Sequence, residues 1–327
     1  LDSVDGKQLA VTSRLNPQSQ FGADVIARSD HVLQNGSGDE LARCIRQALD
    51  EMLGELAAKA GIDRTEIYQI AVVGNTCMHH LFLNISPASL VHAPYNPAVR
   101  ENIMAKASDL NLKIHPEGTV LMLSNIAGFV GADTVGCLIA CDMEHREKMT
   151  LMIDIGTNGE MVLGNKNRMI TCSTAAGPAF EGAKIACGMR GAKGAVDHIE
   201  MKEGKIVYST IGNVKAVGIC GSGLMDIVAM LLKEGFIEDT GRLMDPDELE
   251  TEQAIANQDR IIKVDGKNAF KITEDVYLTQ KDIGEVQQAK AAIAAGIILL
   301  CKKMGIEIED IEEILIAGAF GNYMRAS

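Results

Sequence analysis

The stretch LMIDIGTNGEMVLG, residues 151–164, decides the fold of this 327-residue chain. Two apolar runs flank Asn158-Gly159, a dipeptide strongly associated with two-residue hairpins, because both central residues of a type I′ turn adopt positive φ. The pattern therefore predicts a β-hairpin with a type I′ turn at Asn158-Gly159. Its first strand carries Asp154 to the mouth of that turn.

Residues 154–159 also have the composition of a phosphate and metal site. A carboxylate at Asp154 can hold Mg²⁺ through water, Gly156 lets the backbone approach phosphate oxygens, and Thr157 adds a hydroxyl and an N–H. Taken alone, the same residues also describe an ordinary hairpin with a solvent-exposed aspartate. Both interpretations stay open at this point.

The glycine-rich segment GICGSGLMD, residues 218–226, leads into a predicted helix over residues 223–234. The N-terminal amides of such a helix can receive an anion, so Gly221, Ser222 and Gly223 are candidate phosphate contacts. No G-K-[ST] follows, so this is not a Walker loop. Cys220 is either a reactive thiol at a helix N-terminus or a structural thiol beside a phosphate loop.

Two further segments are almost free of bulky side chains. Residues 171–183, TCSTAAGPAFEGA, suit the lining of a cleft. Their Glu181 either orients a magnesium-bound water or a ribose hydroxyl, or is an ordinary surface carboxylate. Residues 317–322, AGAFGN, follow a predicted strand and either let a flat adenine or ribose lie on the backbone or form a tight strand-to-helix turn. No His or Lys base lies near Ser173 in the sequence, which argues against a serine hydrolase.

Composition excludes several classes of protein. With 31 Lys and Arg against 44 Asp and Glu, the net charge of −13 opposes binding to nucleic acid. The 47% of apolar residues is enough for a large core. The richest apolar run, residues 291–301, is about half of the roughly 20 residues that span a bilayer, and residues 1–5 do not resemble a signal peptide. We therefore expect a cytoplasmic protein without a membrane contact.

Cysteines and histidines do not suggest a metal centre within the chain. The eight cysteines are scattered and form no C-x-x-C pair. His79 and His80 are adjacent, and neighbouring residues of a helix point about 100° apart, so they are poor joint ligands for one ion.

Strands and helices alternate along the chain, which predicts an α/β layer architecture. A charged stretch at residues 144–148 separates two domains, 1–147 and 148–327, the second with a polar insertion at about 238–271. The expected helices cover residues 40–60, 131–144, 223–234 and 283–304, and one more starts at Met78 behind an Asn75 or Thr76 cap. The expected strands cover residues 8–14, 69–73, 119–123, 149–155, 160–164, 167–174 and 312–316.

Eight motifs together make the chain similar to a known family over nearly its whole length. It resembles the C-terminal ATP-binding domain of the reductive activators of corrinoid proteins, in the actin, sugar-kinase and heat-shock-chaperone superfamily. The matching segments are 16–18, 22–26, 73–76, 128–133, 154–160, 173–182, 218–223 and 317–323. The resemblance implies two RNase H-like lobes with a nucleotide cleft between them.

The resemblance also implies a function. Such proteins use ATP to drive the uphill one-electron reduction of cob(II)alamin to cob(I)alamin on a methyltransferase partner, a corrinoid protein or corrinoid subunit. The electron arrives through an N-terminal [2Fe-2S] domain. We accordingly expect a slow ATPase that works as a homodimer, with ATP or ADP and Mg²⁺ as cofactors. ATP then contributes binding and conformational free energy and transfers no phosphoryl group to a substrate.

Site residues follow from the resemblance position by position. The second phosphate motif falls on Asp154 and residues 156–159, which are Gly156, Thr157, Asn158 and Gly159. Asp154 and, from its place in the small-residue segment, Glu181 are the candidate catalytic residues. The adenosine motif falls on Gly318, Ala319 and Gly321, and Gly221, Ser222 and Gly223 are placed less securely. An oxygen of Ser173 or Thr174 is a candidate contact to the corrinoid cobalt, and simple cleft lining is the alternative.

Three parts of the family pattern are not in this sequence. A first phosphate hairpin of the D-I-G-T-T-T type is expected before Leu1, no iron–sulfur motif is present, and the final helix expected after Tyr323 is cut at Ser327. These departures predict a piece of a longer protein. The alternative functions are a small-molecule kinase of the same superfamily, a nucleotide-gated interaction module, and an activator whose cluster bridges two subunits through Cys187 and Cys220.

Overall fold

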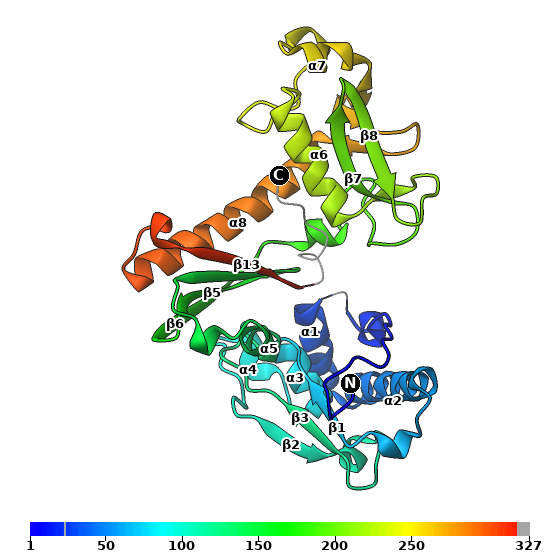
Figure 1. Cartoon of the computed structure of the whole chain (residues 1–327), viewed down its shortest axis with the longest axis vertical. Helices are drawn as coiled ribbons and strands as arrows, with labels where there is room; N and C mark the ends of the chain where they lie inside the picture. The colour runs from blue at the N-terminus through cyan, green and yellow to red at the C-terminus, as the bar shows by residue number, and fades with distance from the viewer. Residues whose placement is uncertain (23, 319–327) are drawn as a thin grey trace. The chain divides into compact units, whose positions relative to one another are not determined.

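The computed structural model describes residues 1–22 and 24–318, and it divides the chain into two compact units, Leu1–Glu144 and His145–Ser327 (Figure 1). Each unit has its own sheets, helices and apolar clusters. The two units are therefore described one after the other.

Unit 1 combines a small mixed sheet with helices. Strand β1 is parallel to β3, and β2 pairs antiparallel with the other side of β3. Buried Val120 and Met122 of β3 pack in one apolar cluster with Phe82. The elements are α1 Val25–Asn35, α2 Asp39–Ala60, β1 Gln69–Val72, α3 Thr76–Leu83, α4 Ala88–Val91, β2 Ile103–Lys106, β3 Thr119–Met122 and α5 Ala132–Ala140.

Most of the predicted elements of unit 1 are confirmed, and their boundaries have physical causes. The α3 helix starts where Asn75 Oδ1 accepts a hydrogen bond from Met78 N at 2.9 Å, as the cap prediction required. The α2 helix ends at Ala60, and the following Gly61 has a φ of +71°, the left-handed conformation of a glycine C-cap. Helix α5 ends at Ala140, short of the predicted residue 144.

The strand predicted at residues 8–14 is wrong. This segment has no strand assignment and instead lies along α2. Thr12 Oγ1 donates to Glu55 at 2.8 Å, Lys59 Nζ donates to the carbonyl of Val11 at 3.0 Å, and Arg14 pairs with Glu55 at 2.6 Å. The alternating polar residues therefore contact a helix, and the backbone needs no neighbouring strand.

The two adjacent histidines of α3 are both buried in unit 1. His80 Nδ1 lies 2.7 Å from the carbonyl of Thr76, and its Nε2 lies 3.0 Å from the amide of Ala98. Nε2 is therefore an acceptor and Nδ1 a donor, which fixes a neutral tautomer. His79 is 1% exposed, and neither of its ring nitrogens has a hydrogen-bond partner.

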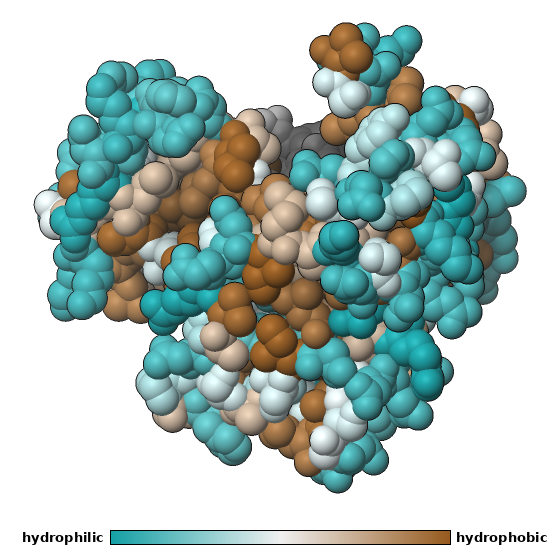
Figure 2. Space-filling model, turned by 90° about the horizontal axis from the view of Figure 1, so that it is seen from below, coloured by the Kyte–Doolittle hydropathy of each residue, from teal (hydrophilic) through white to brown (hydrophobic). Residues whose placement is uncertain are grey.

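Large apolar side chains also remain on the surface of unit 1, among them Tyr68, Met104 and Ile139. Figure 2 shows brown, apolar residues exposed among teal, hydrophilic ones on the face seen from below.

Unit 2 is built on a four-stranded mixed sheet with the order β13-β4-β5-β6. Strands β4 (Thr150–Ile155), β5 (Gly159–Asn165) and β6 (Arg168–Thr174) form an antiparallel meander, and β13 (Glu313–Ala317) joins parallel to β4. These four strands are confirmed predictions. Three antiparallel strands, followed much later by a helix and a strand parallel to the first, form the core of an RNase H-like lobe.

A large insertion separates β6 from the long helix α8 (Gln280–Met304). It holds two three-stranded sheets, with the orders β8-β7-β9 and β10-β11-β12. The region predicted to be a polar insertion contains the fully buried Phe270, so part of it belongs to a core. The insertion's elements are β7 Ala195–Lys202, β8 Lys205–Thr210, β9 Gly218–Ile219, α6 Gly221–Lys233, α7 Glu252–Ala256, β10 Ile261–Val264, β11 Lys267–Lys271 and β12 Tyr277–Thr279.

Helix α8 connects the two parts of unit 2 (Figure 1). Its first half, with Ile283 and Val286, packs into the apolar cluster of the insertion, and its second half, with Leu300 and Cys301, packs against β4 and β5. Among the described residues α8 is also the one helix whose length and composition would let it cross a membrane. Its packing on the sheet accounts for the apolar residues on its buried face.

Candidate functional site

The hairpin of residues 151–164 forms, but its turn differs from the predicted type. Strand β4 ends at Ile155, β5 begins at Gly159, and Gly156 N donates to Asn158 O at 2.9 Å in the three-residue connection. Neither Asn158 nor Gly159 has a positive φ, so the type I′ prediction is wrong. Gly159 instead serves close packing, because a Cβ there would lie 2.9 Å from Thr174 Oγ1.

Asp154 lies near the end of β4, between Ala317 of β13 and Glu160 of β5. Gly318 directly follows β13 with a φ of +83°, and a Cβ built on it would overlap Asp154 Oδ1. The backbone of Gly318 therefore lies against the Asp154 carboxylate. The structure brings together the first residue of the predicted adenosine motif and the carboxylate of the predicted phosphate motif.

Ser173 and Thr174 lie on opposite faces of the sheet. Ser173 is directly opposite Glu160, and its Oγ donates to Glu160 Oε1 at 3.0 Å. Thr174 Oγ1 donates to the carbonyl of Gly159 at 3.2 Å, and a Cβ on Gly296 of α8 would lie 2.8 Å from Thr174 Cγ2. Ser173 therefore shares a face with Asp154 and Glu160, whereas Thr174 faces α8.

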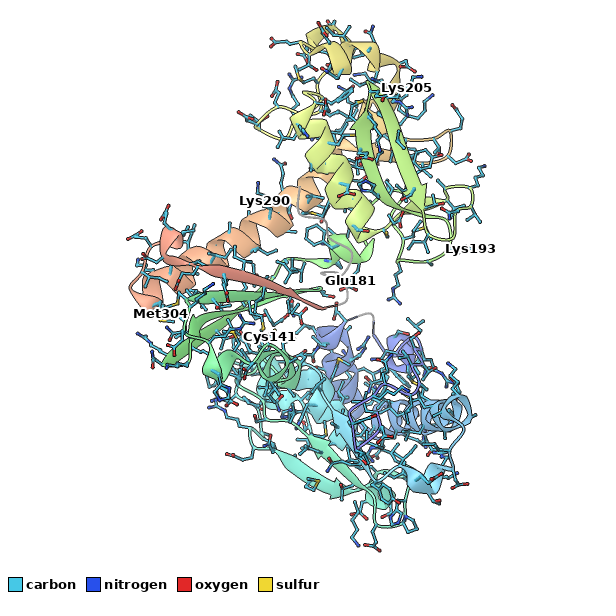
Figure 3. All side chains as sticks on the ribbon, in the orientation of Figure 1. Cys141, Glu181, Lys193, Lys205, Lys290 and Met304 are labelled. Carbon is cyan, nitrogen blue, oxygen red and sulfur yellow. The ribbon has the colours of Figure 1, made fainter. Side chains whose placement is uncertain are left out.

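The small-residue segment after β6 folds back onto the tip of the hairpin. The amide of Gly177 donates to the carbonyl of Thr157 at 2.9 Å, and Thr157 Oγ1 donates to the carboxylate of Glu181. Glu181, labelled in Figure 3, closes the short 3₁₀-helix η5, Pro178–Glu181, and it is exposed. Three predicted site residues, Thr157, Asn158 and Glu181, are thus part of one turn region.

A buried cap anchors the same segment to α8. Asp282, 1% exposed, accepts hydrogen bonds from the amide of Ala186 at 2.9 Å and from the amide of Thr279 at 2.8 Å. Its own amide donates to Thr279 Oγ1 at 3.2 Å, which completes a capping box. The start of α8 therefore fixes the segment that carries Glu181.

Gly221, Ser222 and Gly223 form the buried first turn of α6. A Cβ on Gly223 would overlap the carbonyl oxygen of Val196 in β7. Close packing of α6 on β7 thus requires this glycine whether or not a ligand binds. Cys220 is buried at the N-cap and donates through Sγ to the carbonyl of Val196 at 3.3 Å.

The other predicted residues are Cys187, Ala319 and Gly321. Cys187 Sγ donates to the carbonyl of Asp275 at 3.9 Å. Ala319 and Gly321 lie outside the described residues.

The side chains at this end of the sheet offer oxygen donors, the kind of ligand that a hard cation prefers. Carboxylates of Asp154, Glu160 and Glu181 and the hydroxyl of Thr157 are oxygen ligands of the kind that Mg²⁺ takes. A Cβ on Gly156 would meet Asn158 O at 3.7 Å and nothing closer, so the backbone there is open to approach. Burial raises the pKa of the Cys172 thiol, with the negative charge of Glu160 adding to the effect.

Glu160 is not among the site residues predicted from the sequence. The signal that would have found it is the sheet register: with a three-residue connection centred on Thr157, Glu160 is directly opposite Asp154.

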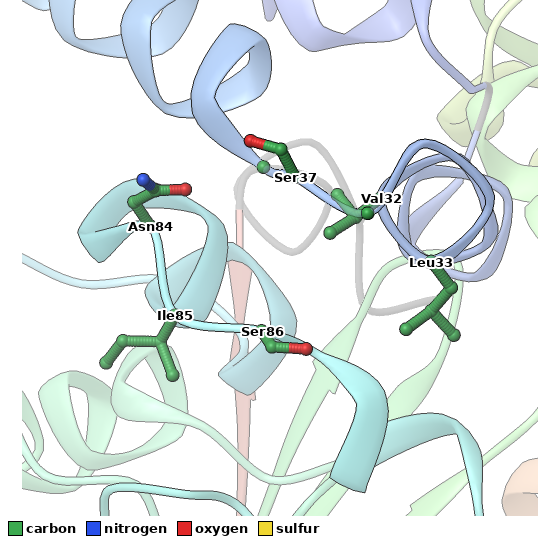
Figure 4. A pocket seen from close by; sticks show the side chains of 8 residues that line it. Val32, Leu33, Ser37, Asn84, Ile85 and Ser86 are labelled. Carbon is green, nitrogen blue, oxygen red and sulfur yellow. The ribbon is translucent and has the colours of Figure 1, made fainter.

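Unit 1 also contains a cavity that was not predicted. It measures about 290 Å³ and lies where the end of α1 meets the end of α3 (Figure 4). Asn84 donates to Asp39 at 2.6 Å beside it, and Ser37 Oγ accepts from the amide of Asp39 at 3.1 Å. Its lining residues are Val32, Leu33, Gly36, Ser37, Gly38, Asn84, Ile85 and Ser86. None of them is a predicted site residue.

Comparison with known families gives two matches that together cover nearly the whole chain. Residues 148–327 match the family described as the C-terminal domain of RACo, the ASKHA domain. Residues 1–146 match the family described as the RACo middle region.

Individual proteins with similar sequences have names that refer to the activation or reduction of corrinoid proteins. The chain is 42% identical over 333 residues to the corrinoid activation enzyme RamQ of Eubacterium limosum, covering 99% of this chain and 55% of that protein. It is 27% identical over 338 residues to the [Co(II) methylated amine-specific corrinoid protein] reductase of Methanosarcina barkeri, covering 93% and 57%.

A solved structure is similar as well. The reductive activator for corrinoid, iron-sulfur protein matches with a TM-score of 0.84 and 35% identity, over 98% of this chain and 51% of its own. This chain thus spans about half the length of the proteins it matches.

Proposed function

Because the chain belongs to the RACo family of reductive activators of corrinoid proteins and its residues 148–327 have the actin-like ATPase, or ASKHA, fold, we propose that it is the nucleotide-binding part of such an activator. The activity is the ATP-driven reduction of cob(II)alamin to cob(I)alamin on a corrinoid protein. The observation that carries the proposal is the contact of Gly318 with the Asp154 carboxylate, because it joins the adenosine and phosphate motifs at one end of one sheet.

Each residue has a definite task in this proposal. Asp154 holds Mg²⁺ through water, the backbone from Gly156 to Gly159 receives phosphate oxygens, and Gly318 begins the adenosine contact. Glu181 orients the Thr157 hydroxyl through their hydrogen bond. Bound MgATP supplies binding free energy that favours one conformation of the protein over another.

Gly221 and Ser222 stay in the proposal as phosphate contacts of lower rank. Their neighbour Gly223 already has a packing role against Val196.

The partner of the proposed activator is a corrinoid protein, or the corrinoid subunit of a methyltransferase. The names of the relatives, which refer to corrinoid activation and to a corrinoid protein reductase, support this choice. Of the two hydroxyls predicted to reach the cobalt, we favour Ser173, because Thr174 is turned toward α8. A homodimer, a cytoplasmic location and an electron supply from a [2Fe-2S] domain complete the proposal.

The test is ATP binding and hydrolysis by the full-length protein with Asp154→Ala. We expect slow hydrolysis by the wild type that a corrinoid protein stimulates, and an affinity for MgATP lower by roughly 10–100-fold in the variant, the usual range for losing an outer-sphere ligand. Asp197→Ala in β7 is the control, since Asp197 bonds Ser209 within the insertion. Unchanged affinity in Asp154→Ala would refute the site. Phosphorylation of a sugar or carboxylate would identify a kinase instead.

A further inference from the structure

Glu160 and Ser173 form a hydrogen-bonded pair across two antiparallel strands. They are directly opposite in the register of β5 and β6, both are half-buried, and Ser173 Oγ lies 3.0 Å from Glu160 Oε1. An ionised carboxylate can only accept hydrogen bonds. The serine is therefore the donor, and the direction of its single proton is fixed.

This direction has a chemical consequence for the serine oxygen. A hydroxyl that gives its proton to a carboxylate keeps both lone pairs free for another partner. The charge-assisted bond also polarises the oxygen and makes it more electron-rich. A carboxylate behind a metal-binding histidine acts in the same way, fixing the ligand's orientation and raising its basicity.

The surroundings of the pair keep it on one side of the sheet. Ser173 shares its face with Asp154, because Asp154 is opposite Glu160 and Glu160 is opposite Ser173. The next residue of each strand turns toward the other face, where α8 lies. The Ser173 oxygen is thus held in the same row as the proposed magnesium carboxylate.

We infer that Glu160 is a positioning residue for Ser173: it holds the Ser173 hydroxyl so that Oγ donates an electron pair to the cobalt of the partner's cob(II)alamin. The inference rests on the proposed function, which supplies the corrinoid partner. One Co–O coordination bond forms, the proton stays between Ser173 and Glu160, and no electron moves in this step.

The test uses the electron paramagnetic resonance spectrum of cob(II)inamide, a corrinoid with an open axial position, mixed with the full-length protein. We expect the wild type to change the cobalt spectrum and Ser173→Ala to abolish the change. Glu160→Gln keeps the size of the side chain but removes its charge. We expect it to weaken the apparent affinity for cob(II)inamide by roughly 10–100-fold, the range for outer-shell partners of metal ligands.

A matched pair in the insertion provides the control. Ser209 Oγ donates to Asp197 Oδ1 at 2.7 Å across β7 and β8, which is the same chemistry away from the hairpin. Asp197→Asn should leave the cobalt spectrum unchanged. Thermal unfolding of each variant establishes that it is folded, and Glu160→Ala, which also removes the charge, replaces Glu160→Gln if the latter does not fold.

The outcomes distinguish a failure of the inference about Glu160 from a failure of the proposed function. If Ser173→Ala loses the spectral change and Glu160→Gln keeps the wild-type affinity, the inference about Glu160 is overturned and the proposed function stands. If the wild type gives no spectral change, or Ser173→Ala retains it, the cobalt contact in the proposed function is overturned, and the inference falls with it.

Discussion

Gly318 is the residue on which the proposed site most directly depends. Its φ of +83° and the overlap that a Cβ would make with Asp154 Oδ1 both require glycine. Gly204, in the β7–β8 turn, has a φ of +73° but open space around it. Alanine should cost about 1–2 kcal/mol of stability at either position, because both adopt a left-handed conformation.

Only one of these two substitutions should affect the binding of MgATP. In Gly318→Ala the Asp154 carboxylate has to move. We therefore expect the free energy of MgATP binding to weaken by at least as much as the free energy of unfolding falls. In Gly204→Ala the affinity should be that of the wild type. Isothermal titration calorimetry with MgATP makes the comparison, and equal affinities in the two variants would contradict the arrangement at Asp154.

A single turn decided which site residues could be predicted from the sequence. A two-residue turn at Asn158-Gly159 would place Asp154 opposite Leu163, whereas the observed three-residue connection places it opposite Glu160. The sequence of the hairpin correctly predicted both strands and the location of Asp154. It could not predict Glu160, because the cross-strand partner depends on the turn type, and the turn depends on how closely Gly159 approaches Thr174.

At the scale of elements, the glycines of α6 and α8 have opposite roles. A Cβ on Gly223 would overlap the carbonyl oxygen of Val196, whereas a Cβ on Gly284 of α8 would meet nothing within 4 Å. We expect Gly223→Ala to lower the free energy of unfolding by roughly 1–3 kcal/mol through overpacking. Gly284→Ala should raise it by roughly 0.5–1 kcal/mol through helix propensity.

Urea unfolding followed by circular dichroism measures both changes. If Gly223→Ala is as stable as the wild type, then α6 does not need its close approach to β7, and a ligand-binding role for this glycine regains weight.

The start of α8 gives a second prediction at this scale. Thr279→Ala removes one cap bond and should cost about 1 kcal/mol, a usual value for an N-cap. Asp282→Ala removes the other half of the box and also the acceptor for the amide of Ala186. It should cost more than Thr279→Ala, since it leaves a buried amide unpaired.

Hydrogen exchange distinguishes the two caps. Faster exchange of the Ala186 amide is expected in Asp282→Ala only. Equal exchange in both variants would show that the cap does not hold the segment that carries Glu181.

Long helices with regular apolar spacing were predicted correctly, whereas the short alternating segment 8–14 was not. Residues 40–60 and 283–304 show helical spacing, and both helices are present with their glycine or threonine caps. Residues 8–14 alternate like a strand, yet their polar side chains bond Glu55 along α2. Alternation reports only which side of an extended chain is buried, so it cannot distinguish a neighbouring strand from a helix surface.

At the scale of the whole molecule, the high glycine content has a mainly structural explanation. The 32 glycines suggested backbone that approaches a ligand. At Gly159, Gly223 and Gly318 the close neighbour is the protein itself: Thr174, Val196 and Asp154. Gly156 is the clear case of open backbone within the predicted phosphate motif. The glycine content thus correctly predicted that the backbone lies close to other atoms at these positions. It could not distinguish a bound ligand from a neighbouring part of the protein.

Acid should destabilise the chain in two separate pH ranges. Burial, with the neighbouring His80, lowers the pKa of His79 from 6.5 to about 4, and burial also lowers the pKa of His80. The unfolded chain therefore binds more protons than the folded one between these values, so the free energy of unfolding falls as the pH drops from 6.5 to about 4. Ion pairs lower the pKa of Glu51 and Glu313, and a hydrogen bond from Thr12, together with Arg14, lowers the pKa of Glu55. The stability that these three carboxylates contribute is lost only at lower pH, below their ordinary value of 4.5.

His79→Phe tests the upper range, because it keeps a buried ring and removes the titrating group. Between about pH 7 and about pH 5 the wild type should lose about 2 kcal/mol through His79 alone. His79→Phe should lose much less, with a remainder from His80. Urea unfolding at the two pH values gives the difference, and His92→Phe at an exposed position is the control. If His79→Phe loses as much stability as the wild type, then His79 is not buried neutral, and the acid sensitivity of unit 1 has another source.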